Sequence, residues 1–181
     1  MFSSIIARIT KWSCFVHKKF FFSRPLAGSG QDRGMSAPIQ IHASCAARGE
    51  DGVLLVGPSG SGKSDLLLRL VDAGYALVAD DRVCLHAGWA SAPPPLAGLL
   101  EVRGIGIVRM AWRARVGVRA VVRLVSMHER TVRLPPPPGR DRVTGLPEFF
   151  LDPARASAVA RVGLILDCVV GYRQLLDEGQ M

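Results

Sequence analysis

Short apolar runs separated by turn residues divide most of this chain into predicted strands. Runs that are rich in apolar and β-branched residues, and bounded by Gly, Pro or Asp, are typical of buried strands. In the first half of the chain they lie at 39–43, 53–56, 75–79 and 82–86. Residues 64–71 differ, because their leucines recur at helical spacing, and the Ala73-Gly74 pair that follows predicts the end of a helix.

The second half of the chain repeats the strand pattern and ends in a predicted helix. Residues 99–103, 116–125 and 148–151 are strand-like, and prolines at 93–95 and 135–138 interrupt the chain between them. Pro153 suits the first position of a last helix, with Asp152 as its N-cap. Strands that alternate with one strong helix, followed by more strands and a final helix, predict an α/β domain.

The turn between the second strand and the first helix carries the clearest chemical signal. It has the complete form G-x-x-x-x-G-K-[ST] of a phosphate-binding loop. Its glycines let backbone N–H groups turn toward phosphate oxygens, Lys63 brings a charge to the outer phosphates, and Ser64 is a ligand for Mg²⁺. We therefore expect ATP and Mg²⁺ here rather than an idle Gly-rich turn. The predicted nucleotide-binding residues are Gly57, Pro58, Ser59, Gly60, Ser61, Gly62, Lys63 and Ser64.

Further candidate residues follow two of the predicted strands. Asp80 and Asp81 come at the carboxyl end of the strand after the helix, where ligands of α/β sheets gather. Their side chains are expected to point to opposite faces, so one can serve the metal and the other a substrate hydroxyl. Glu101 and Arg103 are two positions apart and share one face of a strand. A solvated turn and a surface ion pair are the simpler alternatives for these two pairs.

Composition and charge change this interpretation little. The 181 residues suggest one domain with a tail, and the net charge is +8. Residues 1–34 hold six of the bases against one acid, which leaves 35–181 with a charge of +3. We interpret 1–34 as a disordered or mis-assigned extension, with Met35 as the native start, in preference to a targeting or membrane-surface segment. Residues 35–181 are predicted to form one phosphate-loop domain that does not bind nucleic acid.

The cysteines and the apolar runs indicate the cellular compartment of the protein. Cys14, Cys45, Cys84 and Cys168 are scattered, with neither a metal-binding nor a disulfide spacing. They suit a reducing compartment, so we expect a cytoplasmic protein. No apolar run is long enough to span a bilayer.

Three segments together resemble the catalytic domain of the bacterial HPr kinase/phosphorylase family. They are the phosphate loop at 57–64, the G-Y-A-L-V-A-D-D run at 74–81 and the L-E-V-R-G-I-G-I run at 100–107. The loop alone is generic, whereas the Asp-Asp pair and the E-V-R-G-x-G-I signature are specific and keep the family's order and spacing. The resemblance covers residues 39–110 well and continues weakly toward 165. It is to the short form of some proteobacteria, which lacks the separate N-terminal domain.

The resemblance implies both a fold and a reaction. The fold is the HPr kinase catalytic-domain type, a mixed sheet with a phosphate-loop helix and a C-terminal helix. The reaction is phosphorylation of a serine of HPr, the phosphocarrier of the sugar phosphotransferase system, by ATP or in some members pyrophosphate, with reversal by phosphorolysis. A homo-oligomer is also implied.

Individual roles also carry over from the family's motifs to matching positions here. His42 would otherwise be interpreted as a structural histidine, because lone histidines on a strand usually are. The implied roles are His42 as active-site histidine, Lys63 as phosphate lysine, Ser64 and Glu101 as Mg²⁺ ligands, Asp81 as general base with Asp80 assisting, and Arg103 as the signature arginine of both reactions.

The chain departs from the family pattern at two places. Pro58 replaces the family's usual Asp, and residues 151–155 keep only Pro153 and Arg155 of a V-R-P-G-R-N segment tied to phosphorolysis. The second departure weakens the case for the reverse reaction and for the hexamer of longer members.

Two rival functions are a kinase of small metabolites or nucleotides and a nucleotide-sensing module without turnover. An ABC-type ATPase is disfavoured because the chain has no L-S-G-G-Q signature.

Overall fold

The computed structural model describes residues 38–126 and 135–176. The predicted extension at 1–34 and Cys14 lie outside the described residues. In the described part, no helix is both long enough and apolar enough to cross a membrane. Cys45, Cys84 and Cys168 are free thiols, and burial raises the pKa of Cys45.

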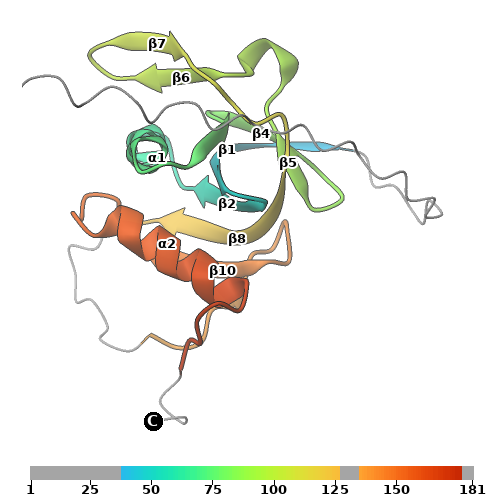
Figure 1. Ribbon diagram of the computed structural model, residues 1–181, viewed down its shortest axis with the longest axis vertical. Helices are drawn as coiled ribbons and strands as arrows, with labels where there is room; N and C mark the ends of the chain where they lie inside the picture. The colour runs from blue at the N-terminus through green and yellow to red at the C-terminus, as the bar shows by residue number, and fades with distance from the viewer. Residues whose placement is uncertain (1–37, 127–134, 177–181) are drawn as a thin grey trace, which may run out of the picture. The chain divides into compact units, whose positions relative to one another are not determined.

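A mixed β-sheet forms the centre of the domain (Figure 1). Around it the pairings close a ring, because β2 pairs with both β1 and β8 while β4 and β5 join β1 to β8. β3 pairs with β1 but is not part of this ring. β10 pairs with β8 and β9 pairs with β10, so these two strands extend the sheet beyond the ring. The strands are β1 (Ile39–Arg48), β2 (Asp51–Val56), β3 (Ala76–Ala79), β4 (Arg82–His86), β5 (Trp89–Ser91), β8 (Val116–Leu124), β9 (Gly139–Arg140) and β10 (Pro147–Leu151).

Strand direction decides where the loops gather. β2, β8 and β10 are parallel neighbours, with Leu54 opposite Val121 and Val122 opposite Phe149. β3 and β2 both run antiparallel to β1, so β3 points the same way as these three. The phosphate loop after β2 and the Asp80-Asp81 pair after β3 therefore leave the sheet at the same edge. This edge is where ligands bind in α/β sheets.

Alternating side chains of the strands build two apolar clusters. Leu55 belongs to the cluster that the helices cover, whereas its neighbour Leu54 belongs to the cluster on the other face of β2. Helix α1 (Lys63–Asp72) and helix α2 (Ala158–Val169) both contribute to the first cluster, α1 through Leu66 and Leu70 and α2 through Leu166. Figure 1 shows α2 lying along β8 and β10.

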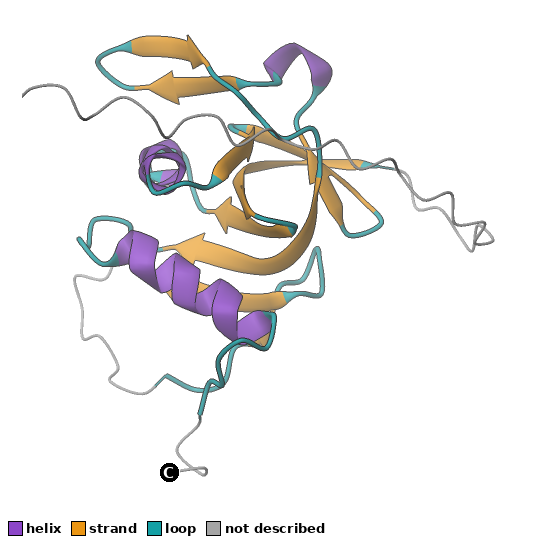
Figure 2. Cartoon of the chain, in the orientation of Figure 1, coloured by secondary structure: helices purple, strands orange, loops and turns teal. Residues whose placement is uncertain are grey.

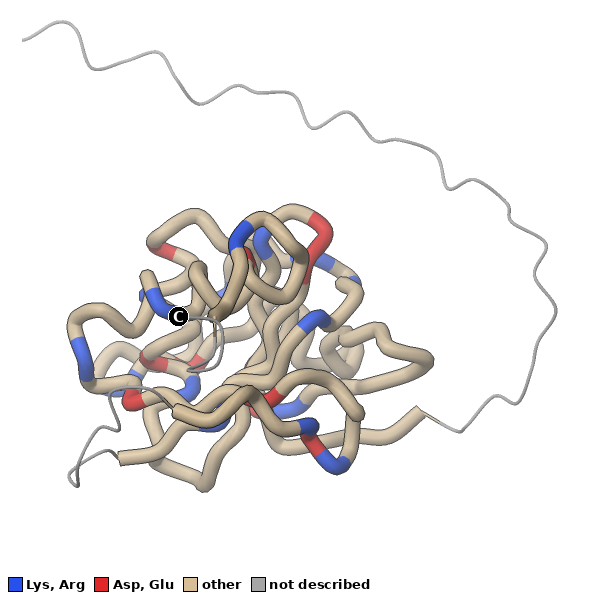
Figure 3. Tube along the Cα trace, turned by 90° about the horizontal axis from the view of Figure 1, so that it is seen from below, with Lys and Arg blue, Asp and Glu red and all other residues tan. Residues whose placement is uncertain are grey.

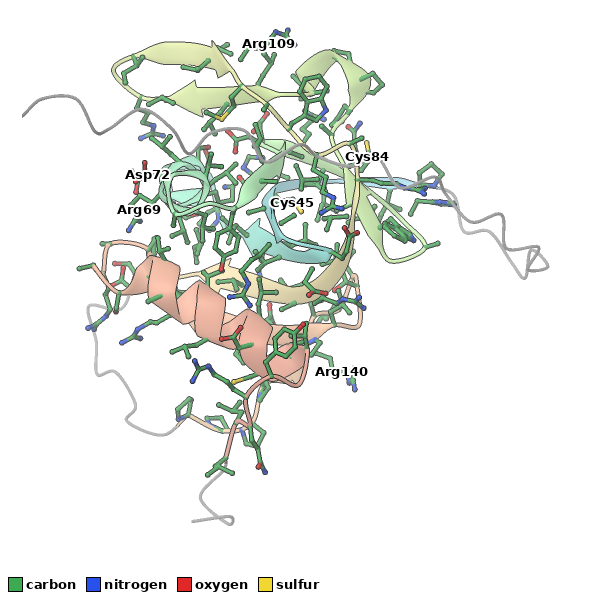
Figure 4. The ribbon with its side chains drawn as sticks, in the orientation of Figure 1. Cys45, Arg69, Asp72, Cys84, Arg109 and Arg140 are labelled. Carbon is green, nitrogen blue, oxygen red and sulfur yellow. The ribbon has the colours of Figure 1, made fainter. Side chains whose placement is uncertain are left out.

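A separate two-stranded hairpin stands beside α1. It consists of β6 (Leu99–Val102) and β7 (Gly106–Arg109), and the short 3-10 helix η1 (Pro94–Leu96) precedes it. Figure 2 shows the hairpin apart from the main sheet, and Figure 4 labels Arg109 on it. Leu100 is buried in the cluster that contains α1 leucines, which fixes the hairpin to the domain.

The last helix begins later than predicted. We expected Pro153 in its first turn and Asp152 as its N-cap, but α2 begins at Ala158. The Asp152 carboxylate does accept a backbone N–H, that of Ala154 at 3.0 Å, and its carbonyl oxygen accepts the N–H of Arg155 at 3.4 Å. These bonds close a local turn, not a helix. The pattern also missed the short strands β5, β7 and β9.

Candidate active site

Lys63 opens helix α1 and folds back over the loop that precedes it. Its ammonium donates to the carbonyl oxygens of Gly57 at 3.0 Å and Pro58 at 2.9 Å. Burial lowers the pKa of Lys63, while the charges of Asp80 and Asp81 act in the opposite direction. The Lys63 ammonium thus lies beside the N-terminus of α1, where a phosphate would contact both the ammonium and the backbone N–H groups.

Two glycines give the loop its close turns. Gly62 precedes α1 with φ of 85°, in the left-handed region that favours glycine. A Cβ on Gly57 would come within 2.6 Å of the Ser61 hydroxyl and 3.2 Å of the Leu124 carbonyl oxygen. Any larger residue at 57 would therefore push the loop away from β8.

Asp80 is the buried member of the acidic pair. Its carboxylate accepts hydrogen bonds from the hydroxyls of Ser44 at 2.7 Å and Ser64 at 3.0 Å. The backbone N–H of Glu101 points to the other carboxylate oxygen at 3.4 Å. One carboxylate thus connects β1, α1 and β6, and it orients the serine hydroxyl that was predicted to bind Mg²⁺.

Asp81 faces outward beside His42. Its side chain is 65% exposed, and its φ of 63° is unusual for a non-glycine residue. His42 Nδ1 lies 3.1 Å from the Asp81 carboxylate and 3.0 Å from the Asp81 carbonyl oxygen. The register of β1 with β4 produces this neighbourhood, because His42 lies opposite Arg82.

A cavity of about 270 Å³ brings most of the predicted residues together. Val102 is the last residue of β6, so Arg103 belongs to the turn rather than to the strand, yet it still reaches the cavity with Glu101. Asp80 does not line the cavity itself, but it accepts a hydrogen bond from Ser64, which does. The predicted residues that line the cavity are His42, Ser59, Gly60, Gly62, Lys63, Ser64, Asp81, Glu101 and Arg103.

The remaining loop residues have other positions. Gly57 and Pro58 offer their carbonyl oxygens to Lys63, and Pro58 and Ser61 line an adjoining cavity. Sequence reasoning missed Ser44, which is fully buried and donates to Asp80. The signal was present, because Ser44 is two residues from His42 and so shares its strand face.

The oxygen donors of this site suit Mg²⁺. Ser64 supplies a hydroxyl and Glu101 a carboxylate, both hard ligands of the kind that this ion takes, and Asp80 orients the Ser64 hydroxyl. In the two described ranges, no three His, Cys, Asp or Glu side chains cluster as a metal cage. A magnesium site of one or two carboxylates completed by substrate phosphates needs no such cage.

Comparison with known proteins identifies the family. The family described as HPr Serine kinase C-terminal domain matches residues 33–128, more than half of the chain. The chain belongs to this family. The predicted resemblance and the predicted α/β fold class are thereby confirmed.

Relatives agree over the part of the chain that carries the site. HPr kinase/phosphorylases of Xanthomonas campestris and Xanthomonas oryzae are each 38% identical over 104 residues, which is 52% of this chain and 32% of theirs. This chain thus matches about a third of the length of these curated relatives. The solved HPr(Ser) kinase/phosphatase of Coxiella burnetii superposes with a TM-score of 0.63 and 25% identity, over 74% of this chain and 92% of that one.

Proposed function

We propose that this protein is a Mg²⁺- and ATP-dependent kinase that phosphorylates a serine of an HPr-like phosphocarrier protein. The observation that carries the proposal is the single cavity in which Lys63, Ser64, Asp81, Glu101 and Arg103 meet. Membership of the HPr serine kinase family supports the choice of acceptor, and the similar proteins of Xanthomonas and Coxiella are named as kinases of HPr.

The loop and its neighbours bind and orient the donor. Lys63 and the backbone N–H groups of the loop hold the phosphates, and Ser64 and Glu101 hold Mg²⁺, with Asp80 orienting Ser64. When bound, Mg²⁺ neutralises the charge that develops on the transferred phosphoryl group. Arg103 adds a positive charge to the lining of the cavity.

Asp81 is the proposed general base. Its exposed carboxylate is accessible to a protein substrate, whereas the Asp80 carboxylate is buried and occupied by two hydroxyl donors. Asp81 accepts the proton of the serine hydroxyl as the serine oxygen bonds to the γ-phosphorus of ATP, while the bond from that phosphorus to the bridging oxygen of the β-phosphate breaks and ADP leaves. His42 contacts the Asp81 carboxylate and its carbonyl oxygen, and so fixes the orientation of the base.

The proposal includes several further expectations from the sequence. A cytoplasmic location agrees with the three free cysteines of the described residues. The homo-oligomer, the lack of nucleic-acid binding and the reverse reaction stay predictions from charge and resemblance. Pyrophosphate as donor rests on the resemblance alone.

The test is transfer of label from γ-labelled ATP with Mg²⁺ to the HPr-like proteins of the same cell. Labelled phosphoserine on such a protein is the expected result, and Lys63→Ala should abolish it. Label on a small molecule would instead favour a metabolite kinase. Binding of ATP without any transfer would favour a nucleotide-sensing module, and either result would overturn the proposal.

A further inference from the structure

A second cavity, of about 640 Å³, lies on the other side of the phosphate loop. Its walls are the loop after β2, residues 124–126 at the end of β8, and residues 152–154 after β10. These three segments leave the carboxyl ends of three parallel neighbouring strands. Ligands of α/β sheets bind outside such ends, so this position suits a ligand that also touches the loop.

The two cavities share part of the loop but differ in chemistry. Ser59, Gly60, Gly62 and Asp65 line both. The first cavity contains Lys63 and Arg103, whereas none of the residues that line the second, all of them within the described ranges, is Lys or Arg. The lining of the second cavity therefore offers no cation to a phosphate group, and the nearby Arg155 is paired with the Asp152 carboxylate at 3.9 Å.

The walls of the second cavity suit an uncharged, partly apolar group. Pro58, Val125, Pro153 and Ala154 offer apolar surface. The polar exceptions include the Asp152 carboxylate and the Ser61 hydroxyl, which is buried and has no hydrogen-bond partner among the described residues. Apolar surface with a few polar groups is the usual lining of a small-molecule site, and the volume lies in the usual range.

One wall is fixed to helix α1 before any ligand binds. Arg69 donates to the Pro153 carbonyl oxygen at 2.5 Å and forms an ion pair with Asp65 at 3.0 Å. Figure 4 shows Arg69 on the side of α1 that faces the segment before α2. Pro153 packs so close to the loop that a Cβ on Gly62 would lie 3.3 Å from it. A preformed wall costs little to order on binding.

We propose that the second cavity is the nucleoside subsite of the phosphoryl donor. The phosphates lie along the shared loop residues, with the reacting end at Lys63 in the first cavity and the base and sugar in the second. The apolar surface of Val125 and Pro153 covers the base, and Asp152 accepts hydrogen bonds from sugar hydroxyls. This inference rests on the proposed function, because it assumes that the loop binds a nucleotide.

The test compares Mg-ATP with Mg-tripolyphosphate, which has the same phosphates and no nucleoside. Wild-type protein should bind Mg-ATP about tenfold or more tightly than Mg-tripolyphosphate in calorimetry. Ala154→Trp and Ser126→Trp introduce bulk at exposed positions on two different segments of the cavity wall, so folding should survive. Both variants should lose about tenfold or more in affinity for Mg-ATP and keep the affinity for Mg-tripolyphosphate. Ala156→Trp, an exposed alanine of the same turn outside the cavity, should change neither affinity.

The outcomes separate this inference from the proposed function. If wild-type protein binds neither probe, the kinase proposal fails and the subsite with it. If it binds both probes equally well, or if both tryptophan variants bind Mg-ATP as tightly as the wild type, the subsite is wrong while the kinase proposal stands. An equal loss of both probes in the variants would mean that the substitutions distort the loop, and it would also overturn the subsite.

Discussion

Asp80 and Asp81 are adjacent in sequence but have opposite surroundings. The prediction that they would face different ways is confirmed, although the reason differs from simple alternation along a strand. β3 ends at Ala79, and the left-handed backbone of Asp81 turns its side chain toward His42. Asp80 keeps the buried position and accepts two serine hydroxyls. The sequence could show the pair, but only the register of β1 with β4 shows which member is accessible.

Asp81→Asn should separate binding from transfer. The amide keeps the size of the side chain but cannot accept the proton of a serine hydroxyl. We expect phosphoryl transfer to fall about 10²–10⁴-fold while the affinity for Mg-ATP changes little. Kinase assays and calorimetry measure the two quantities. Asp72→Asn, at an exposed position at the end of α1, is the matched control and should leave both unchanged. Transfer by Asp81→Asn at the wild-type rate would remove Asp81 as the base.

Ser44→Ala should loosen the buried carboxylate. The variant removes the shorter of the two hydroxyl hydrogen bonds to Asp80, at a residue with no exposed surface. A buried charge that loses a donor is destabilised, so we expect about 1–3 kcal/mol less stability in urea unfolding. Ser126→Ala, at an exposed serine after the end of β8, should cost less than about 0.5 kcal/mol. Equal costs at both positions would mean that Asp80 does not depend on Ser44.

At the scale of elements, long amphipathic segments were predictable and short ones were not. The helix after the loop was expected at 64–71 and spans Lys63–Asp72, because its leucines and its stop signal are local. β5 and β9 have three and two residues, too few for a pattern, and they exist through pairing with β4, β8 and β10. The predicted start of α2 was wrong because an Asp followed by a Pro is typical of a helix N-terminus, but here the two residues form a turn ahead of the helix.

The two faces of α2 should respond differently to truncation. Leu166 is fully buried against the first apolar cluster, whereas Leu164 is 48% exposed. Leu166→Ala leaves a cavity and should cost about 2–5 kcal/mol of unfolding free energy. Leu164→Ala should cost less than about 1 kcal/mol, since much of its surface is already in water. Chemical denaturation measures both, and similar values would contradict the packing of α2 described here.

The whole molecule depends on pairings between distant parts of the chain. Leu54 of β2 lies beside Val121 of β8, and no local pattern connects residues so far apart. This pairing brings the end of β8 to the phosphate loop and creates the second cavity, which the sequence did not indicate. Charges show no comparable order, because Figure 3 shows basic and acidic positions scattered along the described trace.

Ion pairs that join distant elements predict the response of the whole domain to acid. Asp167 of α2 accepts hydrogen bonds from Arg48 of β1 and from Arg173, and bonds from Arg173 and Arg48 lower the pKa of Asp167. Burial raises the pKa of Asp141, but bonds from Thr144 and Val143 and the charge of Arg123 outweigh it and leave the pKa lowered. A carboxyl group with a lowered pKa stabilises the folded state above the unfolded pKa, near pH 4, and loses this effect as the pH falls through the folded value.

Unfolding in urea from pH 7 down to pH 2 measures this dependence. Wild-type stability should fall as the pH drops below about 5, and most steeply below about 4. Asp141→Asn and Asp167→Asn should each be less stable than the wild type at pH 7, and each should lose less stability on acidification, because one linked carboxyl group is gone. The control is Ser126→Ala, which removes no ionisable group and should follow the wild-type acid dependence. A variant that parallels the wild-type curve would show that its carboxylate has the same pKa in the folded and unfolded chains.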